Sequence, residues 1–264
     1  MKWLLLAFAI GTLATQANAA SEPEPLLVLA PYLPATSEQG PAGRDIEIFA
    51  AVMDRCDIDV HFHFYPFKRH LRNFTHEGLG DAVMTVPPDM DTPGFESTPY
   101  VYYQNGAAVL ESTNIKPYHL RYLKGLRVVS FAGASQLLGI ESHIESFASY
   151  SEFADQRIHS RMLFLNRVDV VLADGLIFAE INHRLRADRT YADKADLHQK
   201  VMFIPIFAPT PYRASFRKKE HRDAFNACFS ELEAEGVVRA INVRHIEKYR
   251  DTVGYGYLGY YLNP

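Results

Sequence analysis

His61 and His63 are separated by one residue in a stretch that alternates between polar and apolar residues. If this stretch is a strand, the side chains of His61 and His63 project from the same face and could ligate a transition metal together. Val60, Phe62 and Phe64 occupy the opposite face, so the simpler interpretation is a histidine pair that faces solvent or a neighbouring helix. No Cys/His spacing supplies further ligands. We therefore expect no metal site and no cofactor.

Motifs for nucleophilic or metal-dependent hydrolysis are missing from the sequence. It contains no GxSxG or HExxH pattern and no recognisable order of Ser, His and Asp. Asp174 and Glu47 are acids that could protonate a leaving group if they lay in a cleft with a tuned pKa. Without a catalytic motif we expect a protein that is not an enzyme, and an enzyme remains the alternative.

The N-terminus has the pattern of an export signal. Lys2 precedes an apolar run over residues 3–13, and the Ala-Asn-Ala at 17–19 supplies the small residues that a signal peptidase needs. A membrane-spanning helix needs about twenty apolar residues, and this run is shorter. We expect residues 1–19 to be a cleaved signal peptide and the mature protein to be periplasmic, without a membrane anchor.

The amino-acid composition limits the kinds of molecule that this protein can be expected to bind. The net charge of −4 gives no electrostatic footprint for nucleic acid or anionic membranes. The 17 Phe and 15 Tyr residues are enough to line a pocket or simply to fill a core. Cys56 and Cys228 form an even pair in an exported chain, which is compatible with a disulfide bond in the oxidising periplasm or with two buried free thiols.

The hydrophobic pattern predicts an α/β protein built from two cycles. The expected elements of the first cycle are a strand at 26–30, a helix at 44–55, a strand at 60–64, a helix at 68–77 and a strand at 81–86. The second cycle has a strand at 126–131, a small-residue turn at 132–135, helical segments through 165, a strand at 168–173 and a helix at 177–185. Extended runs at 100–110 and 201–207 join the cycles, and a long helix is expected at 222–241.

Seven short motifs occur in an order that resembles the bacterial extracellular solute-binding proteins of family 3, the periplasmic receptors of amino-acid-type ABC importers. The resemblance covers nearly the whole mature chain. Its marks are Gly-Arg-Asp-Ile-Glu at 43–47, Tyr-Pro-Phe-Lys-Arg at 65–69, Gly-Leu-Gly-Asp-Ala at 78–82, Ser-Thr-Pro-Tyr at 97–100, Leu-Lys-Gly-Leu-Arg-Val at 123–128, Asn-Arg-Val-Asp-Val at 166–170 before Asp174, and Glu-Gly at 235–236.

The resemblance implies a two-lobe, type II periplasmic binding fold with two hinge-crossing segments. Lobe one would comprise residues 20–103 plus 208–264, and lobe two would comprise residues 104–207. Such proteins close on a small ligand like a hinged clamp, and a membrane permease recognises the closed form. We therefore expect a monomer whose partners are a small molecule and an inner-membrane ABC permease.

The resemblance also implies which residues line the ligand site. Tyr32 and Phe67 would form an aromatic wall in lobe one, beyond the ends of two strands. In lobe two, Phe131 and Ser135 flank a glycine turn whose backbone N–H groups would hold an anionic part of the ligand. Asp174 would pair with a ligand's amino group, or would simply cap the helix that follows it.

One departure from the family concerns the ligand's carboxylate. The family's amino-acid binders carry an arginine a few residues past the third strand, whereas residues 85–92 here contain no basic side chain. Arg69 is the nearest substitute, and it either points into the cleft or pairs with a surface acid. The ligand is therefore expected to be amino-acid-like or related, with its identity open.

Two further roles are compatible with the same scaffold. A sensor subunit would bind a ligand in the same way and report to a membrane signalling protein, and a few relatives of this type are enzymes, such as cyclohexadienyl dehydratase. The tyrosine-rich tail at 254–261 could be a binding strip, although a strand or loop packed on lobe one is the simpler expectation.

Overall fold

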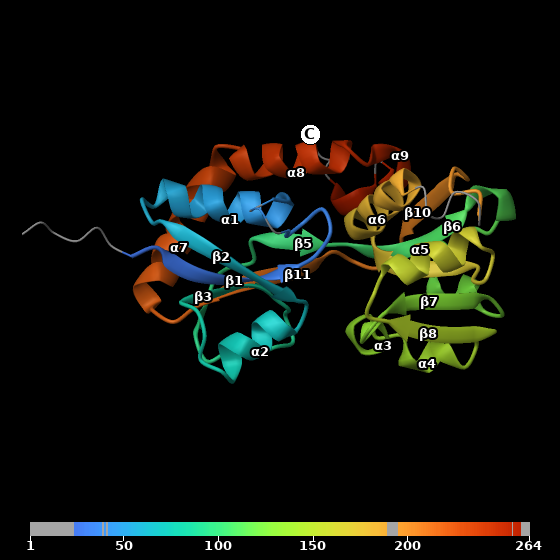
Figure 1. The fold of residues 1–264 in the computed structure, drawn as a ribbon, viewed down its shortest axis with the longest axis horizontal. Helices are drawn as coiled ribbons and strands as arrows, with labels where there is room; N and C mark the ends of the chain where they lie inside the picture. Colours follow the sequence, from blue (N-terminus) through green and yellow to red (C-terminus); the bar gives the residue numbers. More distant parts are fainter. Residues whose placement is uncertain (1–23, 39, 41, 189–194, 255, 260–264) are drawn as a thin grey trace, which may run out of the picture.

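The computed structural model describes residues 24–38, 40, 42–188, 195–254 and 256–259, so the predicted signal peptide lies outside the described residues. Two mixed sheets, each covered by helices, lie side by side in Figure 1 and confirm the predicted two-lobe α/β architecture. None of the helices in the described part of the chain combines the length and the apolar character that crossing a bilayer requires.

The first lobe contains a sheet in the order β2-β1-β3-β11-β4, with β5 also paired to β11. Its elements are β1 (Leu26–Tyr32), α1 (Arg44–Arg55), β2 (Val60–Pro66), α2 (Arg69–Thr75), β3 (Ala82–Val86), β4 (Phe95–Glu96), β5 (Val101–Tyr103), β11 (Thr210–Phe216) and α7 (Lys219–Ala234). Val28 and Ala30 pack in the cluster that contains α1, whereas Leu29 packs in the cluster that contains α2. β1 is therefore covered on both faces, which explains its continuous apolar sequence.

The second lobe contains a sheet in the order β10-β6-β9-β7-β8. Its elements are β6 (Asn105–Leu110), η1 (Glu111–Thr113), η2 (Leu120–Leu123), β7 (Arg127–Phe131), α3 (Ala134–Leu137), α4 (Glu141–Ile144), β8 (Ser149–Phe153), α5 (Arg157–Phe164), β9 (Val170–Asp174), α6 (Gly175–Ala187) and β10 (Val201–Pro205). The prediction of helical segments through residue 165 missed β8. β8 lies at the edge of the sheet and none of its residues is fully buried, so its sequence has no clear apolar alternation.

The chain crosses between the lobes twice, once from β5 to β6 and once from β10 to β11. Gln104 lies on the first crossing and ties three segments together. Its backbone N–H donates to Asp174, its side-chain amide donates to the carbonyl of Phe207 on the second crossing, and its side-chain oxygen accepts from the backbone N–H of Leu258. The hinge is therefore a hydrogen-bonded node between both crossings and the C-terminal segment.

The predicted long helix at 222–241 is two helices, α7 and α8 (Val237–Glu247), followed by α9 (Arg250–Val253) and η4 (Tyr257–Gly259). Gly236 separates α7 from α8 with a φ of 78°, a left-handed conformation that glycine adopts without strain and that commonly ends a helix. The helical pattern of the side chains continues through this break, which is why the sequence did not reveal it.

The described part of the C-terminal segment, from the end of α8 onward, lies against the second lobe, not the first. Four side chains of this segment are buried in the core of the second lobe: Ile246, Tyr249, Val253 and Tyr257. The expectation that the tail packs on lobe one is therefore corrected, because α8 carries the chain across to α6 and β10 (Figure 1). The remaining tyrosines of the tail, at 255, 260 and 261, lie outside the described residues.

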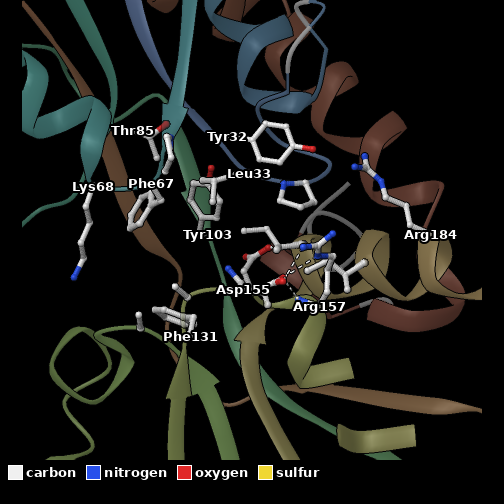
Figure 2. A pocket seen from close by; sticks show the side chains of 18 of the residues that line it. Tyr32, Leu33, Phe67, Lys68, Thr85, Tyr103, Phe131, Asp155, Arg157 and Arg184 are labelled. Carbon is white, nitrogen blue, oxygen red and sulfur yellow. Dashed lines mark hydrogen bonds and ion pairs between the residues drawn. The ribbon is translucent and has the colours of Figure 1, made fainter. Parts of the chain in front are cut away.

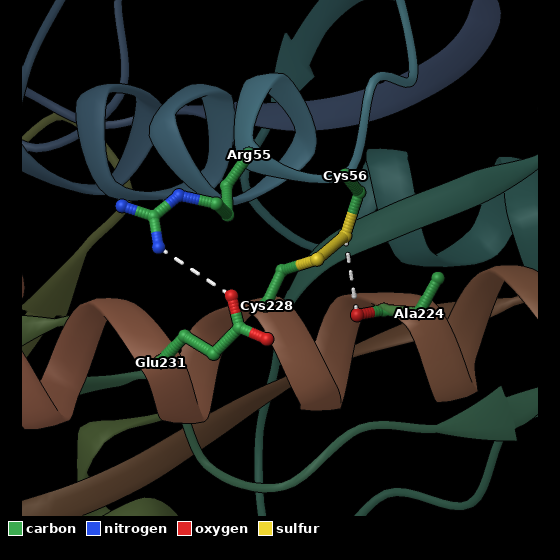
Figure 3. The surroundings of a disulfide bond; sticks show 5 residues. All are labelled: Arg55, Cys56, Ala224, Cys228 and Glu231. Carbon is green, nitrogen blue, oxygen red and sulfur yellow. Dashed lines mark hydrogen bonds and ion pairs between the residues drawn. A yellow bond between two sulfur atoms is a disulfide. The ribbon is translucent and has the colours of Figure 1, made fainter.

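A disulfide bond joins Cys56, directly after α1, to Cys228 in α7, with a Cα–Cα distance of 6.0 Å (Figure 3). The Cys56 sulfur lies 3.2 Å from the carbonyl oxygen of Ala224. Of the two states that the sequence left open, the structure has the disulfide. Both ends of the bond lie in lobe one, beside the ion pair of Arg55 with Glu235.

Candidate functional site

A cavity of about 800 Å³ lies between the two lobes. Its walls come from the carboxyl ends of β1, β2 and β3 in the first lobe and of β7, β8 and β9 in the second. This is where parallel strands of an α/β sheet present loops and helix starts to a ligand. Figure 2 shows the two walls facing each other across the opening.

Aromatic rings line the cavity mainly from lobe one. Tyr32 and Phe67 follow strand ends of lobe one, Tyr103 and Tyr212 belong to its strands β5 and β11 beside the crossings, and Phe131 comes from lobe two. Tyr32 remains 49% exposed at the cavity. The structure thus brings the predicted Tyr32, Phe67 and Phe131 to one cavity, and their binding role stays a prediction.

Asp174 also borders the cavity, but its carboxylate is already used by the protein. One oxygen caps α6 by accepting from the N–H groups of Leu176 and Ile177 at 3.0 and 3.2 Å. The other accepts from the N–H of Gln104 at 2.9 Å and from the hydroxyl of Tyr257 at 2.7 Å. The structure therefore supports the capping alternative that the sequence left open for this residue.

Burial determines the protonation behaviour of Asp174. Only 4% of the residue is exposed, and burial raises the pKa of its carboxyl above the ordinary value. The nearby charge of Arg44 and the hydroxyl of Tyr257 oppose this shift. Arg44 is itself fully buried beside Asp45 and over the ring of Tyr103, so charged groups cluster behind the cavity wall at the hinge.

The start of α3 is occupied by a carboxylate of the same chain. Glu152 accepts from the N–H of Gly133 at 2.6 Å, from the N–H of Ser135 at 2.7 Å and from the hydroxyl of Tyr150 at 2.8 Å. Burial works in the opposite direction, yet these donors hold the pKa of Glu152 below its usual range. Ser135 does not line the cavity, and the expectation that this turn holds an anionic ligand group is corrected because Glu152 fills the position.

Lys68, not Arg69, is the basic residue that the end of β2 presents to the cavity. Lys68 lines the opening with its side chain directed toward lobe two (Figure 2), whereas Arg69 is exposed and outside the lining. The sequence predicted Arg69, the next residue along the chain, at this place. Lys68 has a φ of 70° at the start of α2, and this backbone conformation separates the directions of the two side chains. Sequence alone gave no signal for this left-handed residue, since lysine rarely adopts that conformation.

Lobe two contributes ionic groups that the sequence analysis did not single out. Arg157 donates to Asp155 through two nitrogens, at 2.9 and 2.8 Å, and both residues line the cavity. This hydrogen bonding is the largest cause of the lowered pKa of Asp155. Asp155 lies in the turn between β8 and α5, and Arg157 is the first residue of α5. Strand β8 was not predicted from the sequence, and this turn was therefore overlooked.

An ion pair links the two lobes at the rim of the cavity. Arg184 of α6 lies 2.6 Å from a carboxylate oxygen of Glu38, which belongs to the loop between β1 and α1. A second carboxylate, Glu180, lies 2.6 Å from the Nε of Arg184 and comes from the same helix. The loop of lobe one is therefore held against a helix of lobe two on this side of the cleft.

The other residues considered from the sequence lie outside the cavity. His61 and His63 are exposed on β2 with ring centroids 5.3 Å apart. Within the part of the chain that the structure describes, no group of three or more metal-ligating side chains is close enough to hold an ion. Glu47 is bound on the surface by Arg244 and His245 of α8.

Comparisons with known proteins identify the fold. No protein-family model and no curated protein sequence matches the chain. Among solved structures, the GluR0 ligand-binding core from Nostoc punctiforme in complex with L-glutamate has a TM-score of 0.62 at 16% identity, over 86% of this chain and 100% of that one. A histidine kinase sensor domain with similarity to periplasmic binding proteins has a TM-score of 0.65 at 13% identity, over 83% and 94%.

An amino acid ABC transporter substrate-binding protein, AbpA from Streptococcus pneumoniae, bound to L-arginine, is also similar in structure. Its TM-score is 0.61 at 15% identity, over 84% of this chain and 94% of that one. These likenesses extend over most of each chain and define the class of the fold, which is the two-lobe periplasmic binding protein fold of type II.

Proposed function

We propose that this chain is a periplasmic solute-binding protein related to family 3, which captures a small amino-acid-like or related ligand between its lobes for an inner-membrane ABC permease. The observation that carries the proposal is the cavity of about 800 Å³ that is lined by both lobes, with several rings from lobe one and Phe131 from lobe two. A ligand that touches both walls binds the closed form better than the open form, and therefore shifts the population toward closure.

A periplasmic location is supported by the disulfide and by the predicted signal peptide. A bond between Cys56 and Cys228 persists in an oxidising compartment and is rare in the cytoplasm. The fold neighbours include both a transporter's binding protein and a kinase sensor domain. A ligand sensor for a membrane signalling protein is therefore the second candidate, since closure would serve either partner.

The surroundings of Asp174 and Glu47 support a protein that binds its ligand without converting it. A general acid needs a free proton and access to the leaving group. Asp174 has donors on both oxygens, and Glu47 lies outside the cavity against α8. These contacts support a binding role for the cleft over acid catalysis by Asp174 or Glu47.

The proposal is tested by a thermal-shift screen of the mature protein with amino acids, polyamines, short peptides and small organic acids. A ligand that binds only the folded state raises the melting temperature, by an amount that corresponds to about 2.7 kcal/mol at a hundred times its dissociation constant. Mass spectrometry of each hit after incubation checks that the compound is unchanged. A screen without hits contradicts the receptor, and conversion of a hit favours the enzyme.

Substitution of a wall residue locates the binding site. Phe131→Ala removes one of the rings that face the cavity and should weaken a hit by more than tenfold. Tyr118→Ala is the matched control, because Tyr118 is an exposed ring of lobe two outside the cavity. Equal affinity of both variants would show that the ligand binds elsewhere.

A further inference from the structure

A second chamber adjoins the main cavity and indicates the charge of the ligand. It has a volume of about 350 Å³ and shares Phe67, Lys68, Phe131 and Tyr212 with the main cavity. The two chambers are therefore neighbouring parts of one cleft, and the shared residues stand at their junction. The ligand site of the proposed function extends past these rings toward α2.

The surface of α2 that lines the second chamber is basic. Lys68 directly before α2, Arg72 within it and His76 directly after it all line the chamber, and Arg72 also lies 3.7 Å from the carboxylate of Glu77. Asp89 is the acid among its lining residues. The facing wall of lobe two contributes uncharged residues only, so the positive charge on α2 is not matched across the cleft.

Lys68 differs in its pairing from Arg157 and Arg184, two other cations of the main cavity. Arg157 is held by Asp155, and Arg184 is held by Glu38 and Glu180. Within the described residues, no acid lies within ion-pair distance of the Lys68 ammonium group. Its charge is therefore available to a ligand that enters the junction.

The ammonium group of Lys68 reaches across the cleft to lobe two. A Cβ added to Gly133 would lie 2.7 Å from the Nζ of Lys68, so the lysine tip rests over the start of α3. The N–H groups of this turn already donate to Glu152, which leaves Lys68 as the donor for an incoming anion at this point. The backbone of Lys68 has a φ of 70°, which is a strained conformation for a residue with a Cβ, and such strain clusters at ligand sites.

We propose that the ligand is a small organic anion with an aromatic or extended apolar body, and that Lys68 binds its anionic group between the lobes. The apolar body would lie in the main cavity against Phe67, Phe131 and Tyr103, and the anionic group would lie at the junction of the two chambers. This inference rests on the proposed function and names its ligand class. Because Lys68 spans the cleft, an anion held there contacts both lobes and favours their closure.

Calorimetric titration with four probes of matched size tests the charge preference: phenylacetate, phenyl phosphate, benzyl alcohol and phenethylamine. The two anions distinguish a carboxylate ligand from a phosphate ligand. Lys68→Met removes the charge and keeps the length, Lys68→Arg keeps the charge, and Lys124→Met is the control for loss of an exposed lysine of lobe two outside both chambers. Met and Arg both have a Cβ, so the two variants at position 68 keep the same backbone strain as the wild type.

The expected result is that at least one anion binds more than tenfold tighter than the alcohol and the amine. Lys68→Met should weaken that anion by more than tenfold, whereas Lys68→Arg and Lys124→Met should retain most of the affinity. Tighter binding of the amine or the alcohol, or an unchanged affinity in Lys68→Met, overturns the assignment. It is also overturned if neither anion binds below about 1 mM. A hit of another charge in the thermal-shift screen would still support the receptor, so the two proposals fail separately.

Discussion

Two histidines buried in opposite lobes give this protein an acid-sensitive stability. Burial lowers the pKa of His70 to about 3 and that of His159 to about 4, against an ordinary value near 6.5, although backbone groups oppose the shift. Both side chains are neutral in the folded state and become protonated in the unfolded state below about pH 6.5. The unfolded state then binds more protons, so stability falls as the pH drops below 6.5.

This effect should be visible in urea unfolding at pH 7 and pH 5. Each histidine contributes about 1.4 kcal/mol per pH unit below 6.5, or about 2 kcal/mol between pH 6.5 and pH 5. His159→Leu keeps an apolar filling beside Phe153 and should reduce the pH dependence by that amount. His61→Leu on the exposed face of β2 is the control. A pH dependence equal to that of the wild type in His159→Leu would show that this imidazole titrates normally.

The sequence predicts which residues line the site where those residues lie at the ends of strands. Tyr32, Phe67 and Phe131 each follow or end a strand that the hydrophobic pattern reveals, and the structure places them around one cavity. Lys68 was not predictable, because a left-handed lysine leaves no mark in the sequence. Glu152 was not predictable either, because its position depends on the register of β8, and that strand lies at the edge of the sheet with no fully buried residue.

At the scale of elements, the disulfide fastens α1 to α7 across the helical face of lobe one. The bond closes a loop of 172 positions, and the chain-entropy treatment assigns such a loop about 5 kcal/mol of stabilisation. We expect reduction, or the double substitution Cys56→Ser and Cys228→Ser, to lower the free energy of unfolding by about 2–5 kcal/mol. Urea unfolding with and without reductant measures the loss.

Ligand affinity is the control for this prediction. Both cysteines lie outside the lining of the two chambers, so a hit from the thermal-shift screen should bind the reduced protein, while it remains folded, within a few-fold of its affinity for the oxidised protein. A loss of more than tenfold would mean that the packing of α1 on α7 controls the cleft. Stability unchanged by reduction would mean that the helices hold this face without the bond.

The elements of both cycles were predictable to the extent that each has a buried face. β9 is buried along its whole length, β1 is buried from Val28 to Pro31, and α1 has a clear apolar side. The break at Gly236 was not predicted, because the helical spacing of apolar residues continues from α7 into α8 with little change. The path of the segment after α7 could not be predicted either, since it depends on the tertiary contacts of α8 with α1 and α7 and of α9 with α6 and β10.

At the scale of the molecule, the C-terminal segment is a third connection between the lobes. His245 of α8 is bound to Glu47 of α1 in lobe one, and Tyr249, between α8 and α9, donates to Glu180 of α6 in lobe two. Ile177 and Ile181 of α6 also pack in the core cluster of the first lobe. Closure should therefore be a rotation about this side of the molecule, with the largest displacement at the opposite ends, where α2 and α4 lie (Figure 1).

Spin labels at these opposite ends test the rotation. Glu77→Cys follows α2, Ser142→Cys lies in α4, and both positions are exposed, while the native cysteines remain paired in the disulfide. A saturating hit from the screen should shorten the distance between these two labels. A second pair within lobe one, at Asp54 and Glu77, should keep its distance, because that lobe moves as a unit. If the cross-cleft distance stayed constant while the same ligand raised the melting temperature, the ligand would bind a cleft that is already closed, and neither a permease nor a sensor could recognise occupancy from the angle between the lobes.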